Sequence, residues 1–170
     1  MFKKVIFVSL SFFLIVGCAH NAKDIDQSQT KNKREVPQLT LEDFKGKKVS
    51  ISELDKPAVI NSWAGWCAFC KEELKAFAEA QSEFENKVKI IAINRRETKQ
   101  EAISYTDVLG VTNKLTFLLD PGDKFYREIG GFSMPETIFV NSEGKIVFQK
   151  RGPMDADEIE KKIKEHLLNK

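Results

Sequence analysis

Residues 57–74 read PAVINSWAGWCAFCKEEL. The first part of this stretch is short and mainly apolar, which is typical of a strand buried on both faces of a sheet. Gly65 interrupts the run, and apolar residues then recur at helical spacing, so we expect a helix over 67–84. Two cysteines, Cys67 and Cys70, therefore fall at the point where a buried strand turns into a helix.

The spacing of these two cysteines favours chemistry over structural cross-linking. A disulfide that closes so short a loop constrains the unfolded chain little and stabilises the fold weakly. A cysteine at a helix start faces unpaired backbone N–H groups and the positive end of the helix dipole, and both favour the thiolate that attacks disulfides. We therefore expect Cys67 to be the exposed attacking thiol. Cys70, one turn further, should be buried and should resolve the mixed disulfide.

The rest of the chain alternates between strand and helix patterns. We expect strands over 36–44, 48–51, 57–64, 88–94, 115–119, 137–140 and 145–151, and helices over 67–84, 98–109, 124–129 and 155–168. Thr98 and Glu101 form an expected capping box for one helix, which Gly110 ends. Because parallel strands need right-handed crossovers, this order predicts an α/β domain with a central mixed β-sheet flanked by helices, and with an N-terminal β extension.

The N-terminus carries the features of an export signal. Lys3 and Lys4 precede an apolar run over 5–16, which is too short to span a bilayer comfortably. The run ends in Ile-Val-Gly-Cys at 15–18, a pattern similar to a bacterial lipobox. We expect cleavage before Cys18 and a lipid on its thiol, which would anchor the protein to a membrane. An uncleaved anchor and an ordinary secretory signal are the alternatives.

Three parts of the chain follow from these patterns. They are a lipoprotein signal peptide at 1–17, the lipidated cysteine and a polar, flexible tether at 18–36, and one folded domain at 37–170. Cleavage would remove two lysines and no acids, which leaves 25 basic and 25 acidic residues. A neutral chain offers no electrostatic reason to bind nucleic acid.

Metal binding is a weak alternative for the cysteine pair. Zinc needs four protein ligands, or three and a water. The sequence has no second cysteine pair, and its only histidines are His20 in the tether and His166 in the last helix. We expect no metal and no cofactor other than the redox-active disulfide of Cys67 and Cys70.

Met134-Pro135 stands directly before the strand expected over 137–140. Proline greatly lowers the cost of a cis peptide bond, and the start of a strand tolerates it. We expect a cis bond that lies against Cys67 and leaves the Met134 backbone free to pair with an extended substrate strand. An ordinary trans proline in a turn is the alternative.

Together, the segment 59–74 and Met134-Pro135-Glu136-Thr137 resemble the active-site segments of TlpA-like thioredoxins, which are membrane-tethered proteins that include ResA and CcmG. The likeness runs from about residue 36 to 168. It implies a thioredoxin-like fold and thiol–disulfide exchange outside the cytoplasm.

The resemblance also implies roles for single residues. Cys67 and Cys70 take the attacking and resolving positions of the family, and Pro135 matches its cis-proline. Glu73 matches an acidic residue that tunes the thiols in ResA-like members, with a solvated glutamate as the alternative. Glu136 resembles the glutamate in the Pro-Glu-Thr of CcmG-like members.

Other positions differ from the family pattern. We expect Trp66, Ala68 and Phe69 to face the substrate and to tune the disulfide. Phe69 replaces a proline that is common in the family, which leaves the direction of electron flow open. Asn61 replaces the buried aspartate of ordinary thioredoxins, so that general base is absent.

The expected function is an extracytoplasmic reductase, lipid-anchored in the bacterial cell envelope, that acts on disulfides of envelope proteins, including those of cytochrome c maturation. We expect a monomer that receives electrons from a membrane thiol donor such as a DsbD- or CcdA-like protein. A peroxiredoxin-like peroxidase is an alternative, although Ala64 occupies the Thr/Ser position of the pattern P-x-x-x-[TS]-x-x-C. A disulfide-forming oxidase and a copper-delivery protein are the remaining alternatives. Oxidases of this kind usually carry an inserted helical domain, and copper-delivery proteins on this fold usually carry a CxxxC motif and a histidine.

Overall fold

The computed structural model describes residues 34–169, so the expected signal peptide, Cys18 and most of the expected tether lie outside the described residues. Seven strands form one sheet in the order β2-β1-β5-β4-β3-β6-β7. The strands are β1 (Thr40–Asp43), β2 (Lys48–Ser50), β3 (Ala58–Trp63), β4 (Lys89–Arg95), β5 (Thr116–Asp120), β6 (Glu136–Val140) and β7 (Ile146–Arg151). The helices are α1 (Cys70–Phe84), α2 (Lys99–Leu109), α3 (Lys124–Glu128) and α4 (Ala156–Ile163), and α4 continues as a π-helical turn over Lys164–Leu168.

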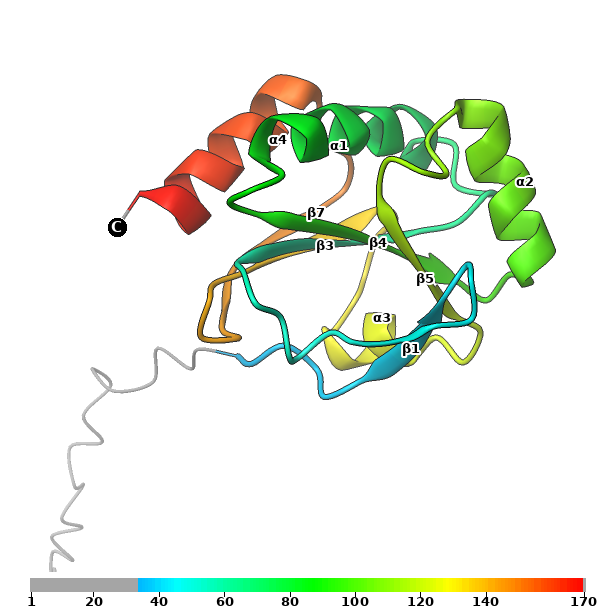
Figure 1. Cartoon of the computed structure of the whole chain (residues 1–170), viewed down its shortest axis with the longest axis horizontal. Coiled ribbons are helices and arrows are strands. Elements are labelled where there is room, and N and C mark those ends of the chain that lie inside the picture. Colours follow the sequence, from blue (N-terminus) through cyan, green and yellow to red (C-terminus); the bar gives the residue numbers. More distant parts are fainter. Residues whose placement is uncertain (1–33, 170) are drawn as a thin grey trace, which may run out of the picture. The chain divides into compact units, whose positions relative to one another are not determined.

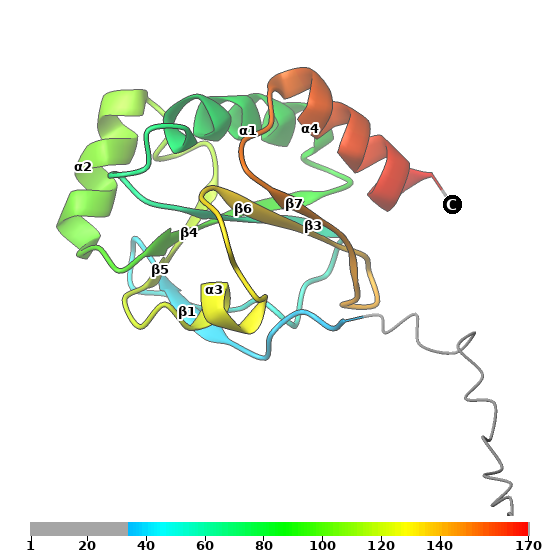
Figure 2. The same ribbon diagram turned by 180° about the vertical axis from the view of Figure 1, so that it is seen from behind.

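The centre of the sheet is parallel and its flanks are antiparallel. β3, β4 and β5 run parallel, whereas β6 lies antiparallel to β3, and β7 antiparallel to β6. The crossovers through α1 and α2 progress in one direction along the sheet, so right-handedness places both helices on the same face. Figure 1 shows these helices and α4 on that face and α3 on the other, and Figure 2 shows the same layers from behind. The predicted mixed sheet with helices on both faces is confirmed.

The predicted N-terminal β extension is also confirmed. β1 pairs antiparallel with both β2 and β5, which extends the sheet beyond its parallel centre. The predicted end of the tether at residue 36 is wrong, because the chain already pairs with the β6–β7 turn before that point. Val36 donates its N–H to the Gly144 carbonyl at 2.9 Å, and the Arg34 carbonyl accepts from the Ile146 N–H at 2.7 Å. Val36 is buried, so its apolar side chain fixes this segment to the domain.

Apolar side chains fill both faces of the sheet. On one face, Ile60, Ile91 and Ile138 pack with Phe125 and Ile129 of the α3 region. On the other face, the α1 and α4 residues Phe77, Phe84, Ile159 and Ile163 pack against β-strand residues such as Phe139. A third cluster, at the end of the sheet where β3 enters α1, contains Cys67 and Cys70. The cysteine pair thus stands on a rigid, two-sided core. Among residues 34–169, no helix is long and apolar enough to cross a bilayer.

The ends of α2 follow the predicted capping pattern. The Thr98 hydroxyl accepts from the Glu101 N–H, and the Glu101 carboxylate accepts from the Thr98 N–H at 2.8 Å, so the capping box is confirmed. Gly110 adopts the left-handed conformation with φ 68° that ends the helix.

A buried ion pair joins the end of β4 to the start of α3. The Arg95 guanidinium donates to both carboxylate oxygens of Asp123 at 2.7 Å, and its Cζ lies 3.3 Å from the centre of the Tyr126 ring. Arg95 and Asp123 are 8% and 6% exposed, so water does little to screen either charge. Removing one partner would therefore leave the other charge buried without compensation.

We expect Arg95→Met to lower the free energy of unfolding by about 3 kcal/mol, because the Asp123 carboxylate then loses its counter-charge. Urea unfolding followed by circular dichroism measures the change. Asp123 has φ 55°, and asparagine tolerates that conformation, so Arg95→Met/Asp123→Asn is the matched double variant. It should recover much of the loss. A single variant that costs less than about 1 kcal/mol would show that the pair is a minor contributor.

Candidate active site

Cys67 and Cys70 form a disulfide with their Cα atoms 5.4 Å apart. The prediction that Cys67 begins the helix is wrong, because α1 begins at Cys70. The Cys67 N–H donates to the Ala64 carbonyl at 3.1 Å, and the Cys67 carbonyl accepts from the Cys70 N–H at 3.1 Å. These two turns carry the chain from β3 into the helix, so Cys67 lies one turn ahead of the first helical residue.

The prediction that Cys67 is exposed is also wrong for the disulfide form. Cys67 is 5% exposed and Cys70 is 0% exposed, so only their order agrees with the expectation. Both cysteines belong to a buried cluster with Trp63 and Leu74, and the other members of this cluster cover most of the disulfide. The neighbouring side chains of Trp66 and Phe69 project instead, at 62% and 66% exposure, and Ala68 is exposed as well. The exposed rings of Trp66 and Phe69 therefore flank the disulfide at the surface, while the sulfur atoms lie beneath.

The predicted cis bond between Met134 and Pro135 is confirmed. Met134 packs against the cluster that contains both cysteines, while Pro135 is buried at the start of β6. Within residues 34–169, neither the N–H nor the carbonyl of Met134 has a backbone partner. The neighbouring hydrogen bonds are made by the N–H and the carbonyl of Ser133 and by the carbonyl of Pro135. Within the described part of the chain, the backbone groups of Met134 are thus unpaired with other backbone, and their pairing with a substrate strand stays a prediction.

Glu73 is a buried member of the site, so the alternative of a solvated glutamate is wrong. It lies one turn after Cys70 on the buried face of α1, and it is 2% exposed. Its Oε1 accepts from the Met154 N–H at 3.0 Å, and its Oε2 accepts from Asn61 Nδ2 at 2.9 Å. The same Asn61 amide donates to Thr137 Oγ1 at 2.9 Å, so the carboxylate connects α1 to β3 and β6.

Burial raises the pKa of the Glu73 carboxyl from 4.5 to about 8, and the hydrogen bonds from Met154 and Asn61 offset only part of that rise. A group with this pKa can hold or release a proton near neutral pH. The sequence showed that Asn61 supplies no base. The structure shows that Asn61 instead orients a carboxylate that arrives from α1.

A groove of about 540 Å³ opens beside the disulfide. It lies between the start of α1, at Phe69 and Glu73, and the start of α4, at Met154 and Asp155. A larger groove of about 630 Å³ lies between α1 and residues 109–114, but none of the predicted site residues lines it. The smaller groove is therefore the relevant one for chemistry at the cysteines.

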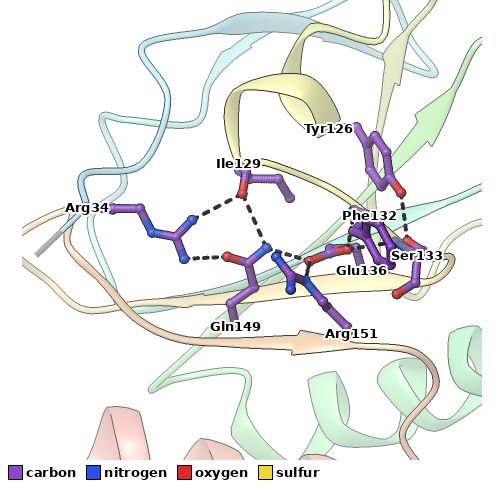
Figure 3. Close-up of polar contacts among 8 residues, drawn as sticks. All are labelled: Arg34, Tyr126, Ile129, Phe132, Ser133, Glu136, Gln149 and Arg151. Carbon is purple, nitrogen blue, oxygen red and sulfur yellow. Dashed lines mark hydrogen bonds and ion pairs between the residues drawn. The ribbon is translucent and has the colours of Figure 1, made fainter. Parts of the chain in front are cut away.

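Glu136 is fully buried and acts on the loop before the cis-proline rather than on the cysteines. Its Oε2 accepts from the N–H groups of Phe132 and Ser133 at 2.9 and 3.2 Å (Figure 3). Its Oε1 accepts from Gln149 Nε2 at 2.5 Å. Of the two predicted glutamates, Glu73 therefore lies near the cysteine pair, whereas Glu136 holds the loop that precedes the cis-proline.

One further residue of the site, Glu97, was not among the residues predicted from the sequence. Its carboxylate accepts from the Gly65 N–H at 2.9 and 3.0 Å and from Asn94 Nδ2 at 2.5 Å, which fixes the turn that leads into Cys67. A Cβ on Gly65 would lie 3.1 Å from Glu97 Oε1 and 3.3 Å from the Tyr105 ring, so this close approach favours glycine. The position of Glu97 just beyond the carboxyl end of a central strand was the signal that could have identified it.

Comparisons with known proteins agree with this geometry. A family model described as the AhpC/TSA family matches residues 33–149. The thiol-disulfide oxidoreductase ResA of Bacillus subtilis is 28% identical over 159 residues, which cover 89% of this chain and 88% of ResA. The thiol:disulfide interchange protein DsbE of Allochromatium vinosum is 27% identical over 154 residues, which cover 89% of this chain and 82% of DsbE.

Solved structures show the same likeness. The exposed lipoprotein thioredoxin of Streptococcus pneumoniae superimposes with a TM-score of 0.65 at 27% identity, covering 76% of this chain and 99% of that one. The family model spans well over half of the sequence, and the sheet, the cysteine pair and the cis-proline occupy the expected places. The chain therefore belongs to the AhpC/TSA family, and it has the thioredoxin-like fold of ResA- and DsbE-like members.

Proposed function

We propose that this protein is an extracytoplasmic thiol–disulfide oxidoreductase that reduces disulfides of envelope proteins through Cys67 and Cys70, without a further cofactor. The observation that carries the proposal is the disulfide itself, which joins two residues at the β3–α1 junction beside the buried Glu73 carboxyl. The names of the ResA and DsbE relatives describe the same class of exchange.

The reaction cycle begins with the reduced pair. The Cys67 thiolate attacks one sulfur of a client disulfide, so that a Cys67–client disulfide forms and the other client sulfur leaves as a thiolate. The Cys70 thiolate then attacks the Cys67 sulfur and releases the second client thiolate. Two electrons have passed to the client, and the Cys67–Cys70 disulfide seen in the structure remains.

Glu73 is placed to serve the second step. Cys70 is fully buried, so its thiol has no direct route for its proton to bulk water. Glu73 is buried one turn along the same helix face, and its pKa of about 8 lets it exchange protons near neutral pH. The groove between the starts of α1 and α4 has Glu73 in its lining, which gives this carboxyl a path to solvent.

The client approaches as an extended segment. The free backbone groups of Met134 can pair with it in the manner of an added strand. The exposed rings of Trp66 and Phe69 offer apolar contact on the side of the cysteines. Backbone pairing accepts many sequences, whereas the surrounding side chains would select among them.

The proposal includes the setting of the reaction. A lipid on Cys18 would anchor the domain to a bacterial envelope membrane, and a relative of known structure is itself named a lipoprotein. A membrane thiol donor of the DsbD or CcdA kind would return electrons to the pair. Cytochrome c maturation is the process that we expect such a reductase to serve.

The reduction potential tests the direction of exchange. We expect the Cys67–Cys70 couple to be reducing, at or below the value of about −180 mV typical of protein disulfide isomerase. Equilibration against glutathione or reduced thioredoxin, read from intrinsic tryptophan fluorescence or alkylation, measures it. A value near −120 mV, as in DsbA, would reassign the protein as a disulfide-forming oxidase.

A further inference from the structure

One exposed aromatic residue takes no part in the mechanism above. Among residues 34–169, the exposed large apolar side chains are Trp66, Phe69, Val108, Phe132 and Val147. Phe132 is 82% exposed and stands two positions before Met134, in the loop that leads to the cis-proline. Residues 133–135 form a bend, and consecutive Cα atoms are 3.8 Å apart, so the Cα atom of Phe132 lies within about 7.6 Å of that of Met134. Phe132 therefore lies beside the place where a client strand would pair.

The backbone at Phe132 is held in place by hydrogen bonds from neighbouring side chains. Glu136 Oε2 accepts from the Phe132 and Ser133 N–H groups, as described above. The Tyr126 hydroxyl donates to the Ser133 carbonyl at 2.9 Å. Figure 3 shows these bonds converging on the loop from α3 and β6. Three backbone groups of two consecutive residues are thus held by buried or half-buried side chains.

A second layer of side chains holds the carboxylate in place. Gln149 Nε2, which donates to Glu136 Oε1, also reaches the Ile129 carbonyl at 3.3 Å. The Arg34 guanidinium donates to the Gln149 side-chain oxygen at 2.5 Å and to the same Ile129 carbonyl at 3.2 Å (Figure 3). Because these side chains brace the loop from β7 and from the N-terminal segment, the backbone position of Phe132 is fixed.

A cation flanks the ring. The Arg151 guanidinium lies 5.7 Å from the centre of the Phe132 ring, and its Nε lies 3.4 Å from Glu136 Oε1. Arg151 forms an ion pair with Glu136 through Nε, and its side chain is 58% exposed, so the other N–H groups of the guanidinium can still donate to an anionic partner. The surface beside Met134 therefore combines an apolar ring with a positive charge.

We propose that Phe132 and Arg151 form a client-recognition site, and that its occupant is an extended client segment with an aromatic residue next to an acidic one, close to the reacting cysteine. This inference rests on the proposed function and names the class of client that it prefers. Two observations support it. Phe132 lies in the same loop as Met134, next to the cysteine pair, and Arg151 offers a positive charge that complements an acidic residue. An aromatic residue of the client would stack on Phe132, and its acidic neighbour would pair with Arg151.

Synthetic peptides with a thiopyridyl-activated cysteine provide the test. The Cys67 thiolate of the reduced protein attacks the peptide sulfur, a Cys67–peptide disulfide forms, and thiopyridone leaves with a measurable absorbance. The preferred probe is Glu-Phe-Gly-Cys-Gly-Phe-Glu, which presents the motif in both directions. Its matched partners are Gln-Phe-Gly-Cys-Gly-Phe-Gln and Gln-Gly-Gly-Cys-Gly-Gly-Gln. Dithiodipyridine, a neutral small disulfide, reports the intrinsic reactivity of Cys67.

We expect the wild-type protein to react about five-fold faster with the Phe/Glu peptide than with the Gly/Gln peptide. Phe132→Ala should remove most of this preference and leave the dithiodipyridine rate unchanged. Val108→Ala, which truncates another exposed apolar side chain, should keep the preference. Arg151→Gln should remove only the advantage of glutamate over glutamine, which we expect to be about two-fold and to fall with salt.

Four results would overturn the inference. The first is a wild-type protein without peptide preference, and the second is a Phe132→Ala variant that retains it. The third is an equal loss toward dithiodipyridine, because that would assign Phe132 to the shape of the loop. The fourth is equal wild-type rates for the two phenylalanine peptides, which would remove the acidic residue from the motif. If the wild-type protein fails to react with dithiodipyridine at all, the proposed function itself falls, so the two failures are distinguishable.

Discussion

Cys67→Ser is expected to lower the rate of client-disulfide reduction by a factor on the order of 10³ or more, because a serine hydroxyl is not ionised near neutral pH and cannot form the mixed disulfide. The fold should survive, since the disulfide closes a loop too short to contribute much stability. Reduction of a disulfide-bonded peptide by the pre-reduced protein measures the rate. Circular dichroism confirms that the variant is folded.

Cys70→Ser is the matched variant, and it should behave differently. Cys67 can still attack, but no second thiol resolves the product, so the mixed disulfide with the client accumulates. Mass spectrometry of this species after expression in cells would name the client. If Cys67→Ser retains activity, or if Cys70→Ser traps through a residue other than Cys67, the assigned order of attack is wrong. Peroxide turnover that depends on Cys67 would instead support the peroxidase alternative.

Local sequence determined how well the site could be predicted. The apolar run of β3, the break at Gly65 and the spacing of the two cysteines are neighbours in the chain, so their structural consequence could be deduced directly. The cis bond at Pro135 was predictable only together with the cysteine pair, because proline lowers the cost of a cis bond but the trans form remains the usual one. The ends of α2 were predictable from local sequence, since capping depends on residues three positions apart.

Tertiary packing determined what could not be predicted. The depth of Cys67 depends on Trp63 and Leu74 closing around the disulfide, and sequence spacing does not report that closure. The burial of Glu73 depends on the Met154 N–H, from a residue 81 positions away. A glutamate in the polar run Lys-Glu-Glu gives no local sign of such a distant partner. The bracing of residues 34–36 against the β6–β7 turn has the same origin.

The Glu73→Gln variant is expected to change how stability depends on pH. Burial raises the pKa of Glu73 from 4.5 to about 8, so between these values the folded protein holds a proton that the unfolded chain has released. Raising the pH through this window therefore favours unfolding, by up to about 1.4 kcal/mol per pH unit. Between about pH 5 and about pH 8, this single group should lower the free energy of unfolding by about 3 kcal/mol.

Glutamine at position 73 cannot titrate, so the variant should lack this loss. Its amide fits the donors of Met154 and Asn61 less well, but that cost is the same at every pH and leaves the slope unaffected. Burial lowers the pKa of His166, yet this group titrates in both proteins and cancels from the comparison. Urea unfolding of the oxidised proteins at the two pH values measures the difference, with Glu72→Gln, on the exposed side of the same turn, as the control. If Glu73→Gln keeps the wild-type slope, the pKa of the Glu73 carboxyl in the folded protein lies close to its ordinary value, and Glu73 would be too weak a base to hold the proton that Cys70 releases.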